Sequence, residues 1–131
     1  MSHALIFPMM AHVGLTAFLY VLLTLMRAPS VWGWGRRADG SNPWSQVEPR
    51  VAANLSNQFE WPMFFHVACL LLAWRQPQPI YLWLAWTFVA GRVVHSGVQI
   101  LTTNVRLRGV VFMINFLAVL GMWGAMLVTG A

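Results

Sequence analysis

Long apolar runs separated by polar segments dominate this sequence. Four such runs cover about residues 4–26, 51–74, 80–101 and 109–128. Each run is close to the roughly 20 residues that an α-helix needs to cross about 30 Å of hydrocarbon. No segment alternates polar and apolar positions as a half-buried strand would. The pattern therefore predicts an all-α membrane protein, a bundle of four transmembrane helices formed by a single domain of residues 1–131.

The first apolar run is predicted to be a membrane span and not a secretory signal peptide. No basic segment precedes it, and no small-residue cleavage site follows it. The only long polar loop lies between Arg27 and Arg50. It is interrupted by Pro29, Gly33, Gly35, Gly40, Pro43 and Pro49. Three tryptophans in this loop, Trp32, Trp34 and Trp44, are predicted to anchor it at the membrane interface.

Composition supports a membrane location. Only 8% of the residues are charged and 59% are hydrophobic, whereas soluble domains contain roughly 25% charged residues. The net charge is +5, and all eight Lys and Arg positions are arginine, since the chain has no lysine. No basic stripe is present, so we expect no nucleic-acid partner and place the arginines at membrane boundaries. The single cysteine, Cys69, cannot form an internal disulfide.

The distribution of arginines predicts the orientation in the membrane. The first loop contains Arg27, Arg36, Arg37 and Arg50, the third contains Arg106 and Arg108, and the second contains only Arg75. Because cytoplasmic loops carry the excess of arginine, loops one and three are predicted to be cytoplasmic and both termini external. The absence of lysine, with abundant arginine, tryptophan and alanine, points to a bacterial inner membrane.

Polar side chains inside two of the predicted spans gather on single helical faces. In the span 51–74, Asn57 and Glu60 lie three residues apart. In the antiparallel span 80–101, the positions i, i+3, i+4 and i+7 are Arg92, His95, Ser96 and Gln99. Such groups are costly in lipid, so both faces are predicted to point into the bundle.

Glu60 and Arg92 lie at matching depths in these two spans. Glu60 is about 13 Å from the cytoplasmic entry and Arg92 about 15 Å, at a rise of roughly 1.5 Å per residue. An unpaired charge at that depth is unfavourable by several kcal/mol. We therefore expect a buried ion pair between them within one protomer, with either a purely structural role or a role in a site.

A candidate ligand site lies in the cytoplasmic half of the bundle, around this pair. It combines Arg50, Asn57, His95, Gln99, Arg106 and Arg108. An arginine-rich polar cavity suits a small anionic ligand with carboxylates and amides. His12 and His66 are interpreted as structural histidines. Their spacing does not match a metal site, so no metal is expected, although haem ligation by two histidines remains an alternative.

Taken together, these residues resemble the MAPEG family, the membrane-associated proteins in eicosanoid and glutathione metabolism. The resemblance covers about residues 45–120. It rests on Arg50, on the sequence Asn-Gln-Phe-Glu-Trp-Pro at 57–62, on Arg-Val-Val-His at 92–95, and on Arg108. It implies a homotrimer that holds glutathione between neighbouring subunits near the cytoplasmic face.

The resemblance also assigns roles to residues. Arg50, Asn57 and Glu60 match the family's ligand residues on the second helix, and Arg92 and His95 match its polar pair on the third. Arg108 matches the arginine that stabilises the glutathione thiolate. Two departures stand out: Gln99 replaces a tyrosine found in several members, and Pro62 follows Glu60 by two residues where many members have three.

Two functions follow from the resemblance. The first is a glutathione-dependent transferase or peroxidase that acts on lipophilic electrophiles or hydroperoxides in the membrane. A thiol has an ordinary pKa near 8.5, and a neighbouring guanidinium favours the reactive thiolate. The alternative is a non-catalytic membrane protein of the same fold that binds a lipid or another ligand. The sequence leaves open whether the protein is an enzyme and whether the thiol is glutathione.

Overall fold

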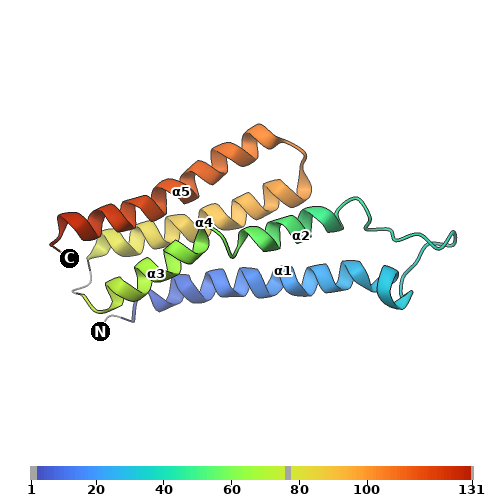
Figure 1. Ribbon diagram of the computed structural model, residues 1–131, viewed down its shortest axis with the longest axis horizontal. Coiled ribbons are helices and arrows are strands. Elements are labelled where there is room, and N and C mark those ends of the chain that lie inside the picture. The colour runs from blue at the N-terminus through green and yellow to red at the C-terminus, as the bar shows by residue number, and fades with distance from the viewer. Residues whose placement is uncertain (1–2, 76–77, 131) are drawn as a thin grey trace.

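The computed structural model describes residues 3–75 and 78–130. The chain forms helices and no strand within these residues, as predicted. The helices are α1 (Ile6–Trp32), α2 (Glu48–Asn57), α3 (Pro62–Ala73), α4 (Pro79–Leu101) and α5 (Val105–Val128). Figure 1 shows α2 and α3 end to end beside α1, so that together they fill one pass of the bundle. The start of α1 and the end of α5 lie at the same end of the molecule (Figure 1).

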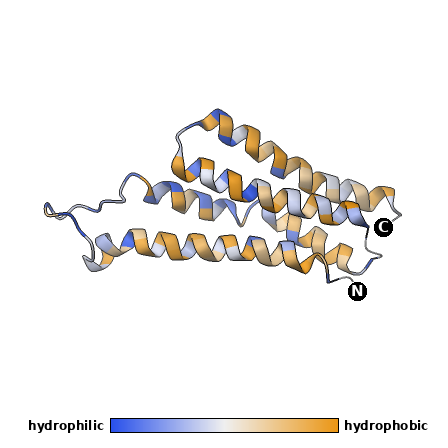
Figure 2. Ribbon diagram, turned by 180° about the vertical axis from the view of Figure 1, so that it is seen from behind, coloured by the Kyte–Doolittle hydropathy of each residue, from blue (hydrophilic) through white to orange (hydrophobic). Residues whose placement is uncertain are grey.

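The helices α1 and α5 are each long and apolar enough to cross a membrane. Hydrophobic residues cover most of both helices in Figure 2. α1 continues six residues past its predicted end at Met26, as far as Trp32. It stops where Gly33 adopts a left-handed conformation, with φ of 78°, and donates its N–H to the Pro29 carbonyl at 3.2 Å. The helix therefore ends at a glycine cap and continues through Arg27, the first charged residue after the apolar run.

The second predicted span, 51–74, is not one continuous helix. α2 ends at Asn57, and α3 begins at Pro62. Pro62 has no N–H to donate to the carbonyl four residues earlier, and its ring would clash with that carbonyl. The chain between the helices makes tighter turns, with Gln58 N–H donating to Leu55 O at 3.1 Å. This break changes the direction in which the following side chains point.

The helices α4 and α5 form a closely packed antiparallel hairpin. Gly91 of α4 lies directly against the side chain of Asn115 on α5, where a Cβ atom would collide with the amide oxygen. An apolar core lies between this hairpin and α3, with the rings of Phe65 and Phe88 stacked 4.2 Å apart. A second apolar cluster joins α1, α2 and the end of α4 around Leu19. The polar residues described below lie between these two clusters along the bundle.

α5 begins four residues before its predicted start. The side chain of Asn104 caps the helix by accepting a hydrogen bond from the Leu107 N–H at 3.0 Å. Arg106 and Arg108 are therefore in the first turns of α5, where the backbone N–H groups create a positive potential. Both arginines belong to the helix, and not to the turn before it.

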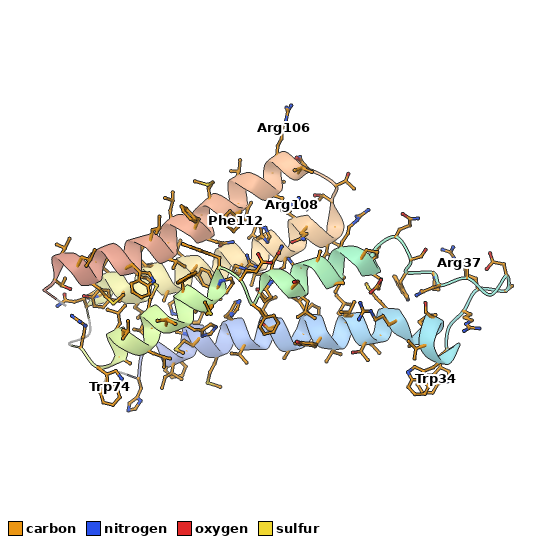
Figure 3. The ribbon with its side chains drawn as sticks, in the orientation of Figure 1. Trp34, Arg37, Trp74, Arg106, Arg108 and Phe112 are labelled. Atoms are coloured by element: carbon orange, nitrogen blue, oxygen red, sulfur yellow. The ribbon has the colours of Figure 1, made fainter. Side chains whose placement is uncertain are left out.

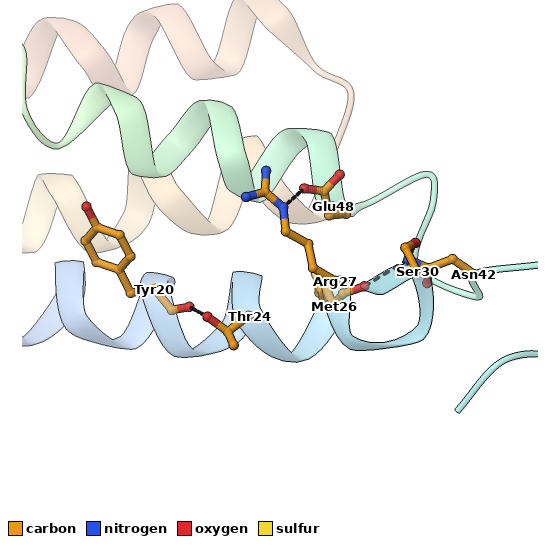
Figure 4. Close-up of polar contacts among 7 residues, drawn as sticks. All are labelled: Tyr20, Thr24, Met26, Arg27, Ser30, Asn42 and Glu48. Carbon is orange, nitrogen blue, oxygen red and sulfur yellow. Dashed lines mark hydrogen bonds and ion pairs between the residues drawn. The ribbon is translucent and has the colours of Figure 1, made fainter. Parts of the chain in front are cut away.

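Side chains tie the loop 33–47 and the start of α2 back to α1. Arg27 forms a salt bridge with Glu48 at 2.6 Å, and Asn42 donates to the Met26 carbonyl at 2.9 Å (Figure 4). Trp32, Trp34 and Trp44 are 68%, 71% and 46% exposed, and the first two stack on each other. The structure places Trp32 at the end of α1, not in the loop. Their exposure suits interfacial anchoring, which itself stays a prediction.

Candidate functional site

The amide of Gln58, at the helix break, connects three helices. Its Nε2 donates to the Asn54 carbonyl at 3.1 Å and to Asn54 Oδ1 at 3.2 Å. Its Oε1 accepts from His12 Nε2 at 2.9 Å and from Arg92 Nε at 3.3 Å. The side chain is 3% exposed, so these contacts occur in the protein interior. Gln58 therefore joins α1, α2 and α4 at the same level of the bundle.

A second amide, Gln99 of α4, extends this network toward the end of the bundle. Gln99 Oε1 accepts from Asn54 Nδ2 at 2.9 Å and from Asn57 Nδ2 at 3.3 Å. The four polar residues of the α4 face, namely Arg92, His95, Ser96 and Gln99, are all buried. The prediction that this face points into the bundle is confirmed.

The predicted ion pair between Glu60 and Arg92 is wrong within one protomer. Glu60 is exposed, and its carboxylate makes no hydrogen bond or salt bridge to any described residue. Arg92 is 1% exposed and donates to Gln58 instead. The prediction that this part of the chain lies at the depth of Arg92 was correct, because Gln58, which does bond to Arg92, is only two residues from Glu60. Glu60 follows the break after Asn57 and is exposed, whereas Asn57 donates to Gln99 in the interior.

A pocket of about 340 Å³ opens where α2 begins, α4 ends and α5 begins. Arg50, Gln99 and Arg108 are among the residues that line it. Arg50 also donates to the Ile100 carbonyl at 3.3 Å, which holds its guanidinium beside the end of α4. The pocket is thus lined by the guanidinium groups of Arg50 and Arg108, from α2 and α5, and by the amide of Gln99 from α4.

Arg106 does not reach this pocket. It is exposed, and Figure 3 shows its side chain pointing away from the bundle, whereas Arg108 lies on the side of α5 that faces α4. The difference follows from helical geometry, because residues two apart lie on opposite sides of a helix. Of the eight site residues predicted from sequence, Arg106 and Glu60 therefore lie outside the polar interior in the protomer.

His95 and Arg92 lie deeper in the bundle than the pocket. In the described part of the chain, Nδ1 of His95 and Nη2 of Arg92 are buried without a hydrogen-bond partner. The His95 ring packs at a tilt against Phe112 of α5, 6.2 Å between centroids. Arg92 is linked to the pocket through Gln58, Asn54 and Gln99, but no such link joins His95 to it.

Sequence reasoning missed Asn54 and Gln58, which connect the network. Both are amides inside an apolar span and four residues apart, and that spacing was the available signal. The two histidines that looked isolated are also partners, with His12 Nδ1 and His66 Nε2 2.9 Å apart. Their contact links α1 to α3. Because the two histidines are distant in sequence, no local sequence pattern indicates this contact.

A comparison with known protein families gives one match for this chain. Residues 5–128 match the MAPEG family. The chain belongs to the MAPEG family. The resemblance found in its motifs is thereby confirmed over nearly the whole chain, as is the prediction of a membrane helical bundle. No similar curated protein and no similar solved structure was found.

Membership in the MAPEG family narrows the function without deciding it. The family includes glutathione transferases and peroxidases as well as members without catalytic activity. The choice between these activities depends on what the residues of this pocket can do.

Proposed function

We propose that this protein is a membrane enzyme that binds glutathione and transfers it to lipophilic electrophiles, or uses it to reduce lipophilic hydroperoxides. The observation that carries the proposal is the pocket in which Arg50 and Arg108 meet beside Gln99. We further propose that the protein is a homotrimer in a bacterial inner membrane. Its termini are outside, and loops one and three, with the pocket, face the cytoplasm.

The pocket has the chemistry that glutathione requires. Glutathione carries two carboxylates and two amide bonds, and guanidinium groups bind carboxylates through paired, charge-assisted hydrogen bonds. Arg50 and Arg108 supply the cations, while Gln99 and Asn57 supply amide groups nearby. In the trimer, the side of the pocket left open by one protomer would be closed by its neighbour.

Arg108 is the proposed activating residue. It is half-buried and lies near the start of α5, so its guanidinium and the helix terminus both favour an anion. The thiol loses its proton to water, and the thiolate then attacks. With an electrophile, a carbon–sulfur bond forms and the leaving group departs with its electron pair. With a hydroperoxide, the terminal oxygen goes to sulfur, the alcohol leaves, and a second glutathione converts the sulfenic acid to disulfide and water.

One observation favours the non-catalytic alternative. Gln99 occupies the position of a tyrosine in several family members and has no acidic proton to give to a leaving group. Its oxygen is already engaged by Asn54 and Asn57. A protein that binds a ligand here without reacting would need the same two arginines, and only the state of the thiol distinguishes the two functions.

Replacing Arg108 with leucine tests the proposal. Glutathione added to the wild-type protein should produce the ultraviolet absorbance of a thiolate at neutral pH. Arg108→Leu should reduce the thiolate fraction about tenfold, the effect of one pKa unit. Turnover with a lipophilic electrophile should fall at least as much, since the thiolate is the nucleophile.

Arg106→Leu is the matched control, because it removes the same charge two residues away and outside the pocket. It should leave the thiolate signal unchanged. If wild-type protein binds glutathione by calorimetry but no thiolate appears, the protein is a binding protein. An equal signal in wild type and Arg108→Leu would show that another group activates the thiol.

A further inference from the structure

A second pocket lies on the other side of the helix break, between α1 and the α2–α3 junction. Its volume is about 520 Å³, within the range of small-molecule sites. Val13, Ala17, Phe59 and Met63 give it apolar walls, and most of its exposed lining surface is apolar. The polar groups in its lining come from His12, Thr16, Tyr20, Gln58 and His66. It opens along the middle of α1, a helix long and apolar enough to span a membrane, where lipid would surround it.

The hydrogen bonds behind this pocket determine which nitrogen atoms carry protons. The Nε2 of Gln58 donates to Asn54, so its Oε1 must be the atom that faces His12. A carbonyl oxygen only accepts, and therefore His12 Nε2 carries a proton. His12 shares Gln58 with the Arg92 cation, and a second buried charge there would be strongly disfavoured. His12 is thus neutral, and its Nδ1 is an acceptor.

His66 must then donate its Nε2–H to His12 Nδ1, across the 2.9 Å contact. A neutral imidazole carries one ring proton, so the other nitrogen of His66, Nδ1, is a bare acceptor. It has no hydrogen-bond partner in the described part of the chain, and the His66 ring is only half-buried. An unused acceptor therefore stands in the wall of an apolar pocket that faces lipid.

We propose that this pocket binds a long-chain amphiphile from the bilayer through an O–H group, with His66 Nδ1 as the acceptor. The hydrocarbon chain would lie against the apolar walls, and the O–H would belong to a hydroxyl or to a protonated carboxyl group. Both sources share one hydrogen-bond chemistry. A cation or a metal does not fit, because the pocket contains no carboxylate.

This site is separate from the proposed glutathione pocket and does not depend on it. The two share no lining residue. They are connected through the interior, because Gln58 lines the lipid-side pocket, Gln99 lines the other, and Asn54 bonds to both. Binding at the lipid side is therefore measurable with no thiol present.

Binding can be measured by NMR of methyl-labelled methionine in a detergent without O–H groups. Met63 lines the pocket and Met126 lies in the core, so the first methyl reports on binding and the second is an internal reference. A sixteen-carbon alcohol should shift the Met63 signal saturably. It should bind about tenfold more tightly than its methyl ether, the effect of one neutral hydrogen bond. The corresponding fatty acid distinguishes a carboxyl from a hydroxyl source. If the O–H belongs to a carboxyl group, the acid should bind below its own pKa, where it is protonated, and not above it.

Two variants at His66 separate the hydrogen bond from the shape of the pocket. His66→Phe keeps a ring but removes Nδ1, so it should reduce the preference for alcohol over ether. His66→Asn keeps a polar group near Nδ1 and should restore part of the preference. Ala17→Phe should fill the pocket and weaken all ligands, while Val21→Phe, on α1 outside the pocket, should change nothing. Equal affinity of wild-type protein for alcohol and ether, or no saturable shift at Met63, would overturn the proposal.

Discussion

At the scale of single residues, the side-chain amides of Gln58, Asn54 and Gln99 connect the polar interior through hydrogen bonds. Gln58 satisfies a guanidinium N–H, an imidazole N–H and an asparagine oxygen at once. A charged residue in its place would add the cost of burying a second ion near Arg92. An amide offers both a donor and an acceptor without that cost. This explains how the bundle tolerates so many polar groups between two apolar clusters.

Gln58→Leu should therefore destabilise the protein strongly. Leucine has a similar volume but leaves Arg92 Nε, His12 Nε2 and Asn54 Oδ1 without partners. Each buried unsatisfied group costs about 1–3 kcal/mol, so the free energy of unfolding should fall by about 3 kcal/mol or more. Denaturant titration in detergent, followed by circular dichroism, measures the change.

Gln46→Leu is the control for this experiment, because Gln46 is exposed in the first loop. It should alter the free energy of unfolding by less than about 0.5 kcal/mol. A loss at Gln58 no greater than at Gln46 would mean that the network contributes nothing to stability.

Individual site residues were predictable where the helix is regular. The α4 face from Arg92 to Gln99 points inward because α4 is unbroken, so helical periodicity places its side chains correctly. Glu60 was placed wrongly because the same periodicity was applied across the break at Pro62. The pairing of His12 with His66 was not predictable, since it depends on how α1 packs against α3.

At the scale of elements, Gly91 and Asn115 set how closely α4 and α5 approach. No Cβ fits at Gly91 without displacing the Asn115 side chain, which is fully buried. Gly14 of α1 and Gly97 of α4, by contrast, have open space around them within the protomer. Composition indicates small residues as candidates for helix contacts, but only the packing shows which one is used.

Gly91→Ala should destabilise the hairpin by about 1–3 kcal/mol, the usual cost of overpacking. The double variant Gly91→Ala with Asn115→Ala should recover much of this loss, because it removes the side chain that collides. Thermal unfolding of the single and double variants, analysed as a double-mutant cycle, tests the coupling.

Gly124→Ala on α5 is the control, since no atom lies within 4 Å of the added Cβ. It should be neutral or should stabilise α5 by up to about 1 kcal/mol through helix propensity. Additive effects of Gly91→Ala and Asn115→Ala would show that the two residues do not restrict each other.

Helix existence was easier to predict than helix ends. The apolar runs correctly predicted where helices form, and two of these helices, α1 and α5, are long and apolar enough to cross a membrane. Their ends depend on local caps, such as Gly33 after α1 and Asn104 before α5, which lie outside the apolar runs. The shift at α5 matters most for function, because it places Arg108 inside the helix and facing the pocket.

At the scale of the whole molecule, the carboxylate of Glu60 stands out because it makes no hydrogen bond or salt bridge to any described residue of the protomer. Glu60 lies exposed at the junction of α2 and α3, midway along the pass of the bundle that these two helices form (Figure 1). A carboxylate facing hydrocarbon at this depth is strongly unfavourable. A neighbouring subunit can supply the polar surroundings that this protomer lacks, which agrees with the proposed homotrimer.

Native mass measurement in a mild detergent should accordingly find three protomers. Glu60→Arg should yield monomers with unchanged helical content, because reversing the charge replaces attraction across the interface by repulsion. Glu48→Arg is the control: it breaks the salt bridge to Arg27 at the edge of the first loop and should leave the trimer intact. Wild-type protein found only as monomers or dimers would refute the trimer. A trimer that persists in Glu60→Arg would show instead that Glu60 faces lipid or water and plays no part in assembly.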